Sequence, residues 1–151
     1  MTILLRSATR DDYELLMAWR SDPEIYQGFY SQGKSLVWEE HIKWMESRNQ
    51  DWRTFIVVYN GRRVGVVTVG QLDHWNPEIG YYIGEKSLWG HGVGKEVVQA
   101  ALDWLRNRGY KYCHTTVLKT NKRSVRLLEN LGFETGIDAR PGEVWYHKNM
   151  L

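Results

Sequence analysis

The sequence contains one cysteine and three prolines among 151 residues, and it has no long hydrophobic run. Because Cys113 stands alone, an intramolecular disulfide is excluded, and we expect a reducing, cytoplasmic environment. The longest apolar run, around residues 55–59, is far shorter than the ~20 residues of a membrane-spanning helix. Residues 1–12 reach two acidic side chains without the apolar stretch of a secretory signal, so we expect neither secretion nor membrane insertion.

The chain also lacks a strong excess of charge of one sign. Its 20 Lys and Arg against 18 Asp and Glu give a net charge of +2, which is too small for a dedicated nucleic-acid binder. Residues 1–52 carry 6 basic and 9 acidic groups, whereas residues 53–151 carry 14 and 9. The second half is therefore the expected binding region for an anionic ligand. The five histidines show no spacing typical of metal ligands, so we expect no metal.

The composition that remains is globular, with 42% hydrophobic and 25% charged residues, over a length typical of a single domain covering residues 1–151. Apolar periodicity predicts the element order β-α-α-β-β-β-α-β-α-β-β, a mixed sheet with helices. The firmest local prediction is a hairpin over 54–69, because Asn60-Gly61 accepts the positive φ angles of a type I′ turn. The other predicted strands cover residues 3–6, 78–83, 112–117, 133–137 and 144–147. The predicted helices begin near Thr9, Ser35, Val93 and Asn121, and Asp22-Pro23 is expected to end the first of them.

Three glycines alternate over residues 90–94, between the strand at 78–83 and a long helix. Glycine lets the backbone turn tightly and point successive N–H groups at one anion, which the positive end of the helix dipole also attracts. The next residues, Lys95-Glu96-Val97, fit neither the P-loop nor the dinucleotide-binding spacing. The stretch is therefore either a phosphate-binding turn or only a connection between strand and helix.

Two motifs in the second half resemble those of the GCN5-related N-acetyltransferases. The first is the pyrophosphate turn Trp89-Gly90-His91-Gly92-Val93-Gly94 after a strand that starts Glu78-Ile79-Gly80-Tyr81, and the second is Asn121 and Ser124 followed by Gly132-Phe133. The usual polar residue at the start of the turn is replaced by Trp89, as in the branch that includes the ribosomal-protein N-terminal acetyltransferases. The resemblance covers nearly the whole chain. It implies an α/β fold with a mixed, mostly antiparallel sheet of about seven strands and four helices, in which splayed strands form an acetyl-CoA cleft.

The resemblance implies acetyl-CoA as the cofactor. Its pyrophosphate would bind the backbone amides of residues 89–95, and its pantetheine arm would pair with residues 81–83 like an added strand. A basic group at Lys119, Lys122, Arg123 and Arg126 suits the remaining phosphate of CoA, or is only a solvated helix face. The implied cofactor-binding residues are Tyr81, Tyr82, Ile83, Trp89, Gly90, His91, Gly92, Val93, Gly94, Lys95, Asn121, Ser124 and Arg126.

Acetyl transfer to an amine requires the removal of a proton, because an alkyl ammonium has a pKa of ~10.4. Glu78 is the candidate general base, with a purely structural role as the alternative. The strand at 112–117 has no carboxylate, and the family's usual general acid, a Tyr seven residues after the Asn, falls on Leu128. Tyr81 or Tyr82 is the candidate substitute, and the backbone near Tyr82 is the candidate oxyanion donor. No Cys-His pair is indicated by spacing, so we expect direct transfer in a ternary complex.

Aromatic residues crowd residues 19–52 and the stretch near residue 75, which flank the predicted cleft. We expect Arg20, Tyr30, His41, Trp44 and Trp75 to contact the acceptor, with an interior position as the alternative for His41. Residues 18–25 are similar to amino-sugar N-acetyltransferases of the pseudaminic-acid pathway, so a nucleotide-linked amino sugar is the first hypothesis for the acceptor. The alternatives are an N-terminal protein amine and a catalytically weak CoA-binding module. The aromatic surface is also compatible with a homodimer.

Overall fold

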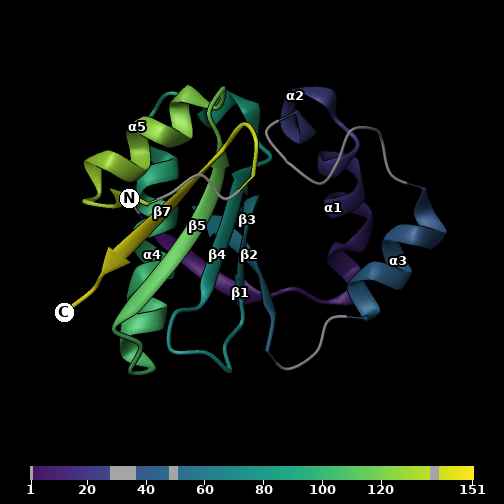
Figure 1. The fold of residues 1–151 in the computed structure, drawn as a ribbon. Coiled ribbons are helices and arrows are strands. Elements are labelled where there is room, and N and C mark those ends of the chain that lie inside the picture. Colours follow the sequence, from purple (N-terminus) through teal and green to yellow (C-terminus); the bar gives the residue numbers. More distant parts are fainter. Residues whose placement is uncertain (1, 28–36, 48–50, 137–139) are drawn as a thin grey trace.

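The computed structural model describes residues 2–27, 37–47, 51–136 and 140–151, which form one seven-stranded sheet flanked by helices (Figure 1). The predicted turn at Asn60-Gly61 is confirmed, with φ angles of 50° and 78°. In chain order the elements are β1 (Ile3–Ser7), η1 (Arg10–Asp12), α1 (Tyr13–Arg20), α2 (Pro23–Tyr26), α3 (Trp38–Glu46), β2 (Arg53–Tyr59), β3 (Arg62–Gly70), β4 (Glu78–Ile83), η2 (Lys86–Leu88), α4 (Val93–Asn107), β5 (Tyr112–Leu118), α5 (Lys122–Asn130), β6 (Glu134–Thr135) and β7 (Glu143–Asn149).

The sheet has the strand order β1-β2-β3-β4-β5-β7-β6, and its neighbouring strands are antiparallel except for the central pair β4 and β5. The predicted mixed, mostly antiparallel sheet of seven strands is thus confirmed. Within the described residues, β4 and β5 are in register only at Glu78 and His114, where the His114 N–H donates to the Pro77 carbonyl at 3.0 Å. Beyond this point the two strands diverge, as the family resemblance implies.

The helix count differs from the expected four, because the described residues contain five α-helices. The additional helix is α2, at the Asp22-Pro23 pair where the sequence predicts only a break. Proline is tolerated in the first turn of a helix, where its missing N–H removes no intrahelical hydrogen bond. The Asp22 carboxylate then caps this turn by accepting a hydrogen bond from the Glu24 N–H at 3.0 Å. The pair therefore ends α1 and starts α2.

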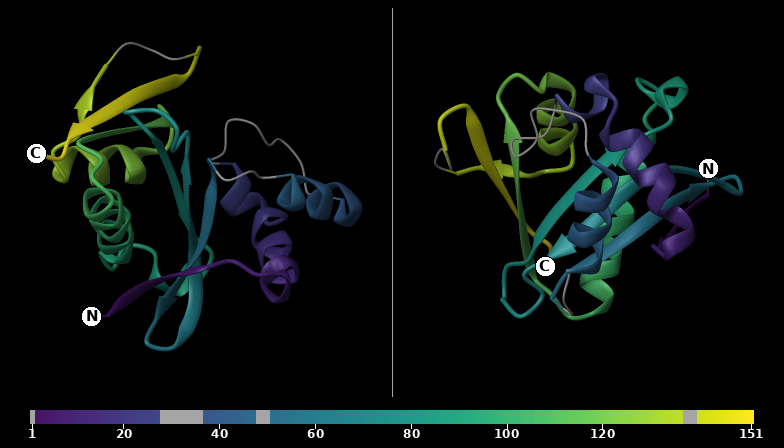
Figure 2. Two further views of the ribbon diagram at one scale, coloured as in Figure 1. Left: turned by 90° about the horizontal axis from the view of Figure 1, so that it is seen from below. Right: turned by 90° about the vertical axis from the view of Figure 1, so that its right-hand side faces the viewer.

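Helices cover both faces of the sheet, with α4 and α5 on one side and α1, α2 and α3 on the other (Figure 2). α4 packs a continuous apolar stripe against the larger core, made by Val97, Val98, Ala101, Leu102 and Leu105. A smaller core of Leu16, Met45, Ile56 and Val66 lies under α1 and α3. The sheet is therefore packed on both faces.

A buried carboxylate fastens the start of α1 to the sheet. The Asp12 side chain is 2% exposed and accepts hydrogen bonds from both Arg6 Nη atoms at 2.9 Å, from Arg63 at 3.2 Å and from the Thr9 N–H at 2.8 Å. The hydrogen bonds from Arg6 are the largest cause that lowers the pKa of Asp12 well below its usual range. Asp12 therefore joins β1 and β3 to the helices that cover one face of the sheet.

We expect Asp12→Ala to lower the free energy of unfolding by about 2 kcal/mol, because it removes a buried carboxylate that accepts hydrogen bonds from Arg6, Arg63 and the Thr9 N–H. Since the pKa of Asp12 is lower in the folded state, its contribution is present above the unfolded pKa of ~3.9 and is lost as the pH falls further. Urea unfolding between pH 3 and pH 7 measures both effects. Asp73→Ala, at a carboxylate that is 56% exposed, is the control, and equal losses for the two variants would contradict this role.

Candidate active site

A cleft of about 1090 Å³ opens where β4 and β5 diverge. One wall comes from β4 and β5, one end from the glycine turn before α4 and the start of α5, and the other end from α1, α2 and α3. The predicted residues that line it are Arg20, Trp44, Glu78, Tyr81, Tyr82, Ile83, Trp89, Gly90, Gly92, Gly94, Lys95, Asn121, Ser124 and Arg126. The structure thus brings most of the candidates from both halves of the chain to one cavity.

The glycine turn has the geometry of an anion-binding loop. Gly90 and Gly92 have φ angles of 81° and 80°, a region that residues with a Cβ rarely adopt, and the space beside both is open. Gly92 is the N-cap of α4, so the first N–H groups of this 15-residue helix have no acceptor within the helix. A Cβ at Gly94 would lie 2.8 Å from Leu127 Cδ1, so this glycine permits the close approach of α4 and α5. Backbone N–H groups and the positive helix end therefore converge on the cleft.

Trp89 anchors the start of this turn. Its indole Nε1 donates a hydrogen bond of 2.9 Å to the Ile83 carbonyl at the end of β4. The Arg123 guanidinium of α5 lies over the ring, 5.0 Å from its centroid. Trp89, which replaces the family's usual polar residue, thus connects β4, the glycine turn and a basic side chain of the cleft.

We expect Trp89→Phe to weaken CoA binding roughly fivefold, because about 1 kcal/mol is lost with the indole hydrogen bond that fixes the turn. Isothermal titration calorimetry with CoA measures this loss. Trp104→Phe is the matched control, because Arg108 lies 4.3 Å from that ring centroid outside the cleft. The same affinity loss in both variants would contradict a local role of Trp89.

Positive charge surrounds the glycine turn. Lys95 follows it on α4, and Lys122, Arg123 and Arg126 line the cleft from α5. The fourth predicted member of this basic group, Lys119, does not line the cleft. These side chains suit an anionic ligand that is larger than one phosphate.

Asn121 lies at the N-terminus of α5. Its side-chain oxygen accepts a hydrogen bond of 3.3 Å from the Ser124 N–H and so caps the helix. Asn121 and Ser124 both line the cleft. The spacing that carries the family motif is thus also the spacing of a helix cap.

Two tyrosines of β4 form the middle of the cleft. Burial raises the pKa of Tyr81, an effect that the Ser124 side chain opposes. Burial also raises the pKa of Tyr82, and the positive charge of Arg20 opposes it. Both phenols are therefore protonated at neutral pH, so they can donate a hydrogen bond but cannot act as bases, and each is a weaker acid than an ordinary tyrosine. Leu128 is fully buried and lines the same cleft, so the position of the family's usual general acid is apolar.

Glu78 lies at the closed end of the cleft, where β4 and β5 begin to part. Its side chain is 34% exposed, and its Oε2 lies 3.9 Å from His114 Nε2 and 3.5 Å from Gln71 Nε2. β5 contributes Thr115, Thr116 and Val117 to the lining but no carboxylate. Glu78 is therefore the carboxylate that the diverging strands contribute to the cleft.

An arginine and a tryptophan meet at the other end of the cleft. The Arg20 guanidinium of α1 lies over the Trp44 ring of α3, 4.3 Å from its centroid. Burial lowers the pKa of Arg20, which still remains charged at neutral pH. Met45 and Leu16 complete this wall. An aromatic face and a positive charge are thus available to an acceptor.

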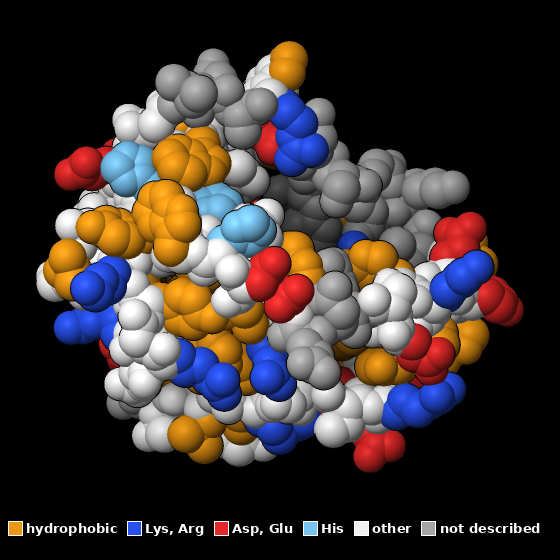
Figure 3. All heavy atoms as spheres, turned by 60° about the horizontal axis from the view of Figure 1, so that its bottom comes forward, with side chains coloured by type: hydrophobic (Ala, Val, Ile, Leu, Met, Phe, Trp, Pro, Cys, Tyr) orange, Lys and Arg blue, Asp and Glu red, His pale blue; other side chains and the backbone are white. Residues whose placement is uncertain are grey.

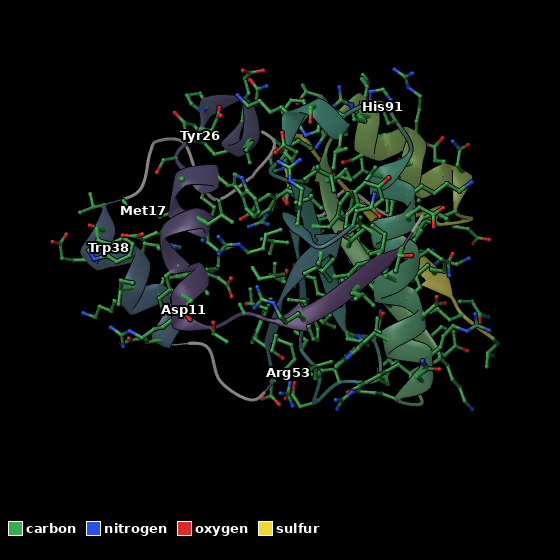
Figure 4. The ribbon with its side chains drawn as sticks, turned by 180° about the vertical axis from the view of Figure 1, so that it is seen from behind. Asp11, Met17, Tyr26, Trp38, Arg53 and His91 are labelled. Atoms are coloured by element: carbon green, nitrogen blue, oxygen red, sulfur yellow. The ribbon has the colours of Figure 1, made fainter. Side chains whose placement is uncertain are left out.

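Several predicted residues lie elsewhere. His41 is 2% exposed and not in the cleft lining, with its Nε2 3.1 Å from the Tyr13 carbonyl. Trp75 is 71% exposed and packs edge-on against Tyr112, away from the lining. The Val93 side chain is in the core, and His91 is exposed at the turn before α4 (Figure 4) and does not line the cleft. Tyr30 lies outside the described residues.

Other residues of the cleft carry no clear sequence pattern. Glu24 and Gln27 reach it from the unexpected helix α2 and its end. Trp52 precedes β2 and lies against Gly70, where any Cβ would clash with its ring. In the sequence, Gly70 at the end of β3 is the one indication that Trp52 packs there. Arg140 lines the cleft while Nε and Nη2 of its guanidinium bind the buried Glu143 carboxylate at 2.8 Å.

Other kinds of site find little support. Within the described ranges, no group of three or more His, Cys, Asp or Glu side chains could hold a metal ion. Burial raises the pKa of the Cys113 thiol to about 12, so it is not a nucleophile at neutral pH. None of the helices described has both the length and the apolar character needed to span a membrane.

Comparisons with known proteins agree with this geometry. The family model described as "Acetyltransferase (GNAT) domain" matches residues 2–134. An uncharacterized protein of Methanocaldococcus jannaschii is 46% identical over 151 residues, which are 98% of this chain and 31% of that protein. The chain thus spans about a third of this relative's length.

Two solved structures share the fold. A domain from the same archaeon has a TM-score of 0.92 and 45% identity, with 98% of both chains covered. The aminoglycoside acetyltransferase AAC(6′)-Ib in complex with coenzyme A has a TM-score of 0.85 and 18% identity, with 98% of this chain and 95% of that chain covered.

Proposed function

Because the chain belongs to the acetyltransferase (GNAT) domain family, whose members are acetyl-CoA-dependent N-acetyltransferases, we propose that it acetylates the primary amine of a nucleotide-linked amino sugar. The observation that carries this proposal is the single cleft that joins the glycine turn, the gap between β4 and β5 and the wall of Arg20 and Trp44. A cofactor and an acceptor can meet in it beside Glu78.

The residues of the cleft fit CoA. The N–H groups at the start of α4 and the cations Lys95, Arg123 and Arg126 would hold its phosphates. The β4 edge at residues 81–83 would pair with the pantetheine arm, because β5 has moved away and leaves that edge uncovered. The cofactor supplies an acetyl group that is activated as a thioester.

The amine must be neutral when it attacks, and Glu78 is placed to accept its proton directly or through one water. A backbone N–H near Tyr82 would stabilise the negative charge that develops on the acyl oxygen. Leu128 supplies no proton, so the sulfur would leave as a thiolate, whose thiol has a pKa of ~8.5, with a hydrogen bond from Tyr81 or Tyr82. No covalent enzyme intermediate is required.

An amino sugar linked to a nucleotide matches the acceptor end of the cleft. Aromatic rings such as Trp44 and Trp52 can pack against a sugar ring or a nucleobase. The Arg20 guanidinium would attract the diphosphate that connects the sugar and the nucleoside.

Two other functions follow from specific observations. A protein N-terminus is also a primary amine, and the Trp89-Gly90 form of the turn resembles the branch that acetylates ribosomal proteins. The apolar side chain at Leu128 would suit a domain that binds CoA with little catalysis.

A coupled assay of free thiol separates the three functions. Purified protein is incubated with acetyl-CoA and with a UDP-linked amino sugar, a peptide with an N-terminal amine, or no amine. We expect thiol release with the amino-sugar nucleotide alone. Release with the peptide alone would favour the protein acceptor, and tight CoA binding without amine-dependent release would favour the binding module.

We expect Trp44→Ala to raise the KM of the acceptor about tenfold while the KM of acetyl-CoA stays within about twofold. The variant removes the aromatic face under Arg20, which is worth about 1.4 kcal/mol at a partly buried site. Trp38→Ala is the matched control, because Trp38 lies on the same helix, is 40% exposed and does not line the cleft. An equal rise of both KM values in Trp44→Ala would contradict an acceptor-specific contact.

A further inference from the structure

A second titratable side chain lies directly behind Glu78. His114 on β5 is the register partner of Glu78 on β4, at the one point where the two parallel strands meet within the described residues. Its Nε2 is 3.9 Å from Glu78 Oε2, and its side chain is 12% exposed. A small rotation of the part-exposed Glu78 side chain would bring this separation to hydrogen-bond length.

The imidazole is held in place by aromatic stacking. The Trp145 ring of β7 lies 5.4 Å from the His114 ring at an interplanar angle of 35°, and His147 lies 5.3 Å beyond it at 33°. Histidine side chains (pale blue) lie beside hydrophobic side chains (orange) on one face of the molecule in Figure 3. The ring is therefore fixed on one side by Trp145 and faces Glu78 with its Nε2.

Opposing effects act on the protonation of the His114 ring. Burial lowers the pKa of His114, and the backbone of Asn76 opposes part of this shift. Glu78 faces the ring from β4, and His147 is its register partner on β7. A carboxylate at this distance stabilises an imidazolium once it forms.

Resting on the proposed function, we propose that His114 is a positioning residue for Glu78, which orients the carboxylate and takes up the proton that it removes from the amine. One N–H bond of the acceptor ammonium breaks and an O–H bond forms at Glu78. That O–H bond then breaks and an N–H bond forms at His114 Nε2. The imidazolium returns its proton to water between turnovers, so no further reactant is needed.

The first test is the pH dependence of kcat. We expect His114→Gln, which keeps a nitrogen donor but cannot titrate, to lower kcat about tenfold at pH 7 and to remove one ionisation from the kcat profile. The KM of acetyl-CoA should stay within about twofold. His147→Gln is the matched control, because it alters the other histidine that stacks on Trp145. A His114→Gln profile with the wild-type shape and height would overturn the relay.

The second test needs no acceptor and so separates this proposal from the proposed function. NMR titration of the His114 ring is compared in the wild type and in Glu78→Gln. We expect the pKa of His114 to fall by about one unit when the carboxylate is removed. An unchanged pKa would overturn the coupling even if the enzyme acetylates amino sugars. A shifted pKa without turnover on any amine would overturn the proposed function and leave the coupling supported.

Discussion

Gly92→Glu is expected to abolish CoA binding, with the dissociation constant raised at least about 100-fold. Gly92 has a φ angle of 80° and is the N-cap of α4, so its neighbours' N–H groups point to the proposed phosphate site. A glutamate there strains the backbone and places a negative charge where the phosphates would bind. Calorimetric titration with CoA measures the loss.

The control for this prediction is Gly109→Glu. Gly109 follows the other end of α4, has a φ angle of 90° and also has open space at its Cβ position. Both variants should lower the free energy of unfolding by about 1–2 kcal/mol through the same backbone strain, whereas only Gly92→Glu should lose CoA. Unchanged CoA affinity in a folded Gly92→Glu protein would refute the phosphate-binding turn.

Glu78→Gln should lower kcat about 100-fold at pH 7, because a positioned general base contributes at least that much to removal of the amine proton. The loss of kcat relative to the wild type should become smaller as the pH rises toward ~10.4, the pKa of an alkyl ammonium, because the amine then loses its proton to solvent. The KM of acetyl-CoA should not change. Initial rates from pH 6 to pH 10 measure this dependence.

Glu85→Gln supplies the comparison for Glu78. Glu85 follows the same strand, is 37% exposed and binds Arg62 and Ser87 outside the cleft. Its rate should match that of the wild type at every pH. A flat ratio between Glu78→Gln and the wild type across the pH range would leave Glu78 with a structural role only.

The family resemblance depends on residues that are close together in the sequence. The positive φ angles at Gly90 and Gly92, the Asn121 cap on Ser124 and the apolar stripe of α4 are local properties. Each follows from a few consecutive residues and their intrinsic backbone preferences. For this reason the cofactor end of the cleft can be predicted from the amino-acid sequence alone.

The acceptor end cannot be predicted in the same way. Composition places many aromatic residues in the first third of the chain, but packing decides which of them line the cleft. Trp44 does so, whereas His41, three positions earlier on the same helix, turns into the interior beside Tyr13. Trp75 lies on the outer surface, because it packs against Tyr112 of β5 instead of the cleft wall.

By itself, the sequence determined the strands, the glycine turn, the Asn121 cap and the family, because backbone conformation and apolar period depend on neighbouring residues. The predicted start of the second helix near Ser35 was not confirmed, because α3 has Val37 as its N-cap and Ser35 lies outside the described residues. Only the tertiary structure decided that α2 brings Glu24 to the cleft and that His114 stands behind Glu78. Both contacts join elements far apart in the chain. His114 and Glu78 meet where β4 and β5 are in register, and this register exists only in the assembled sheet.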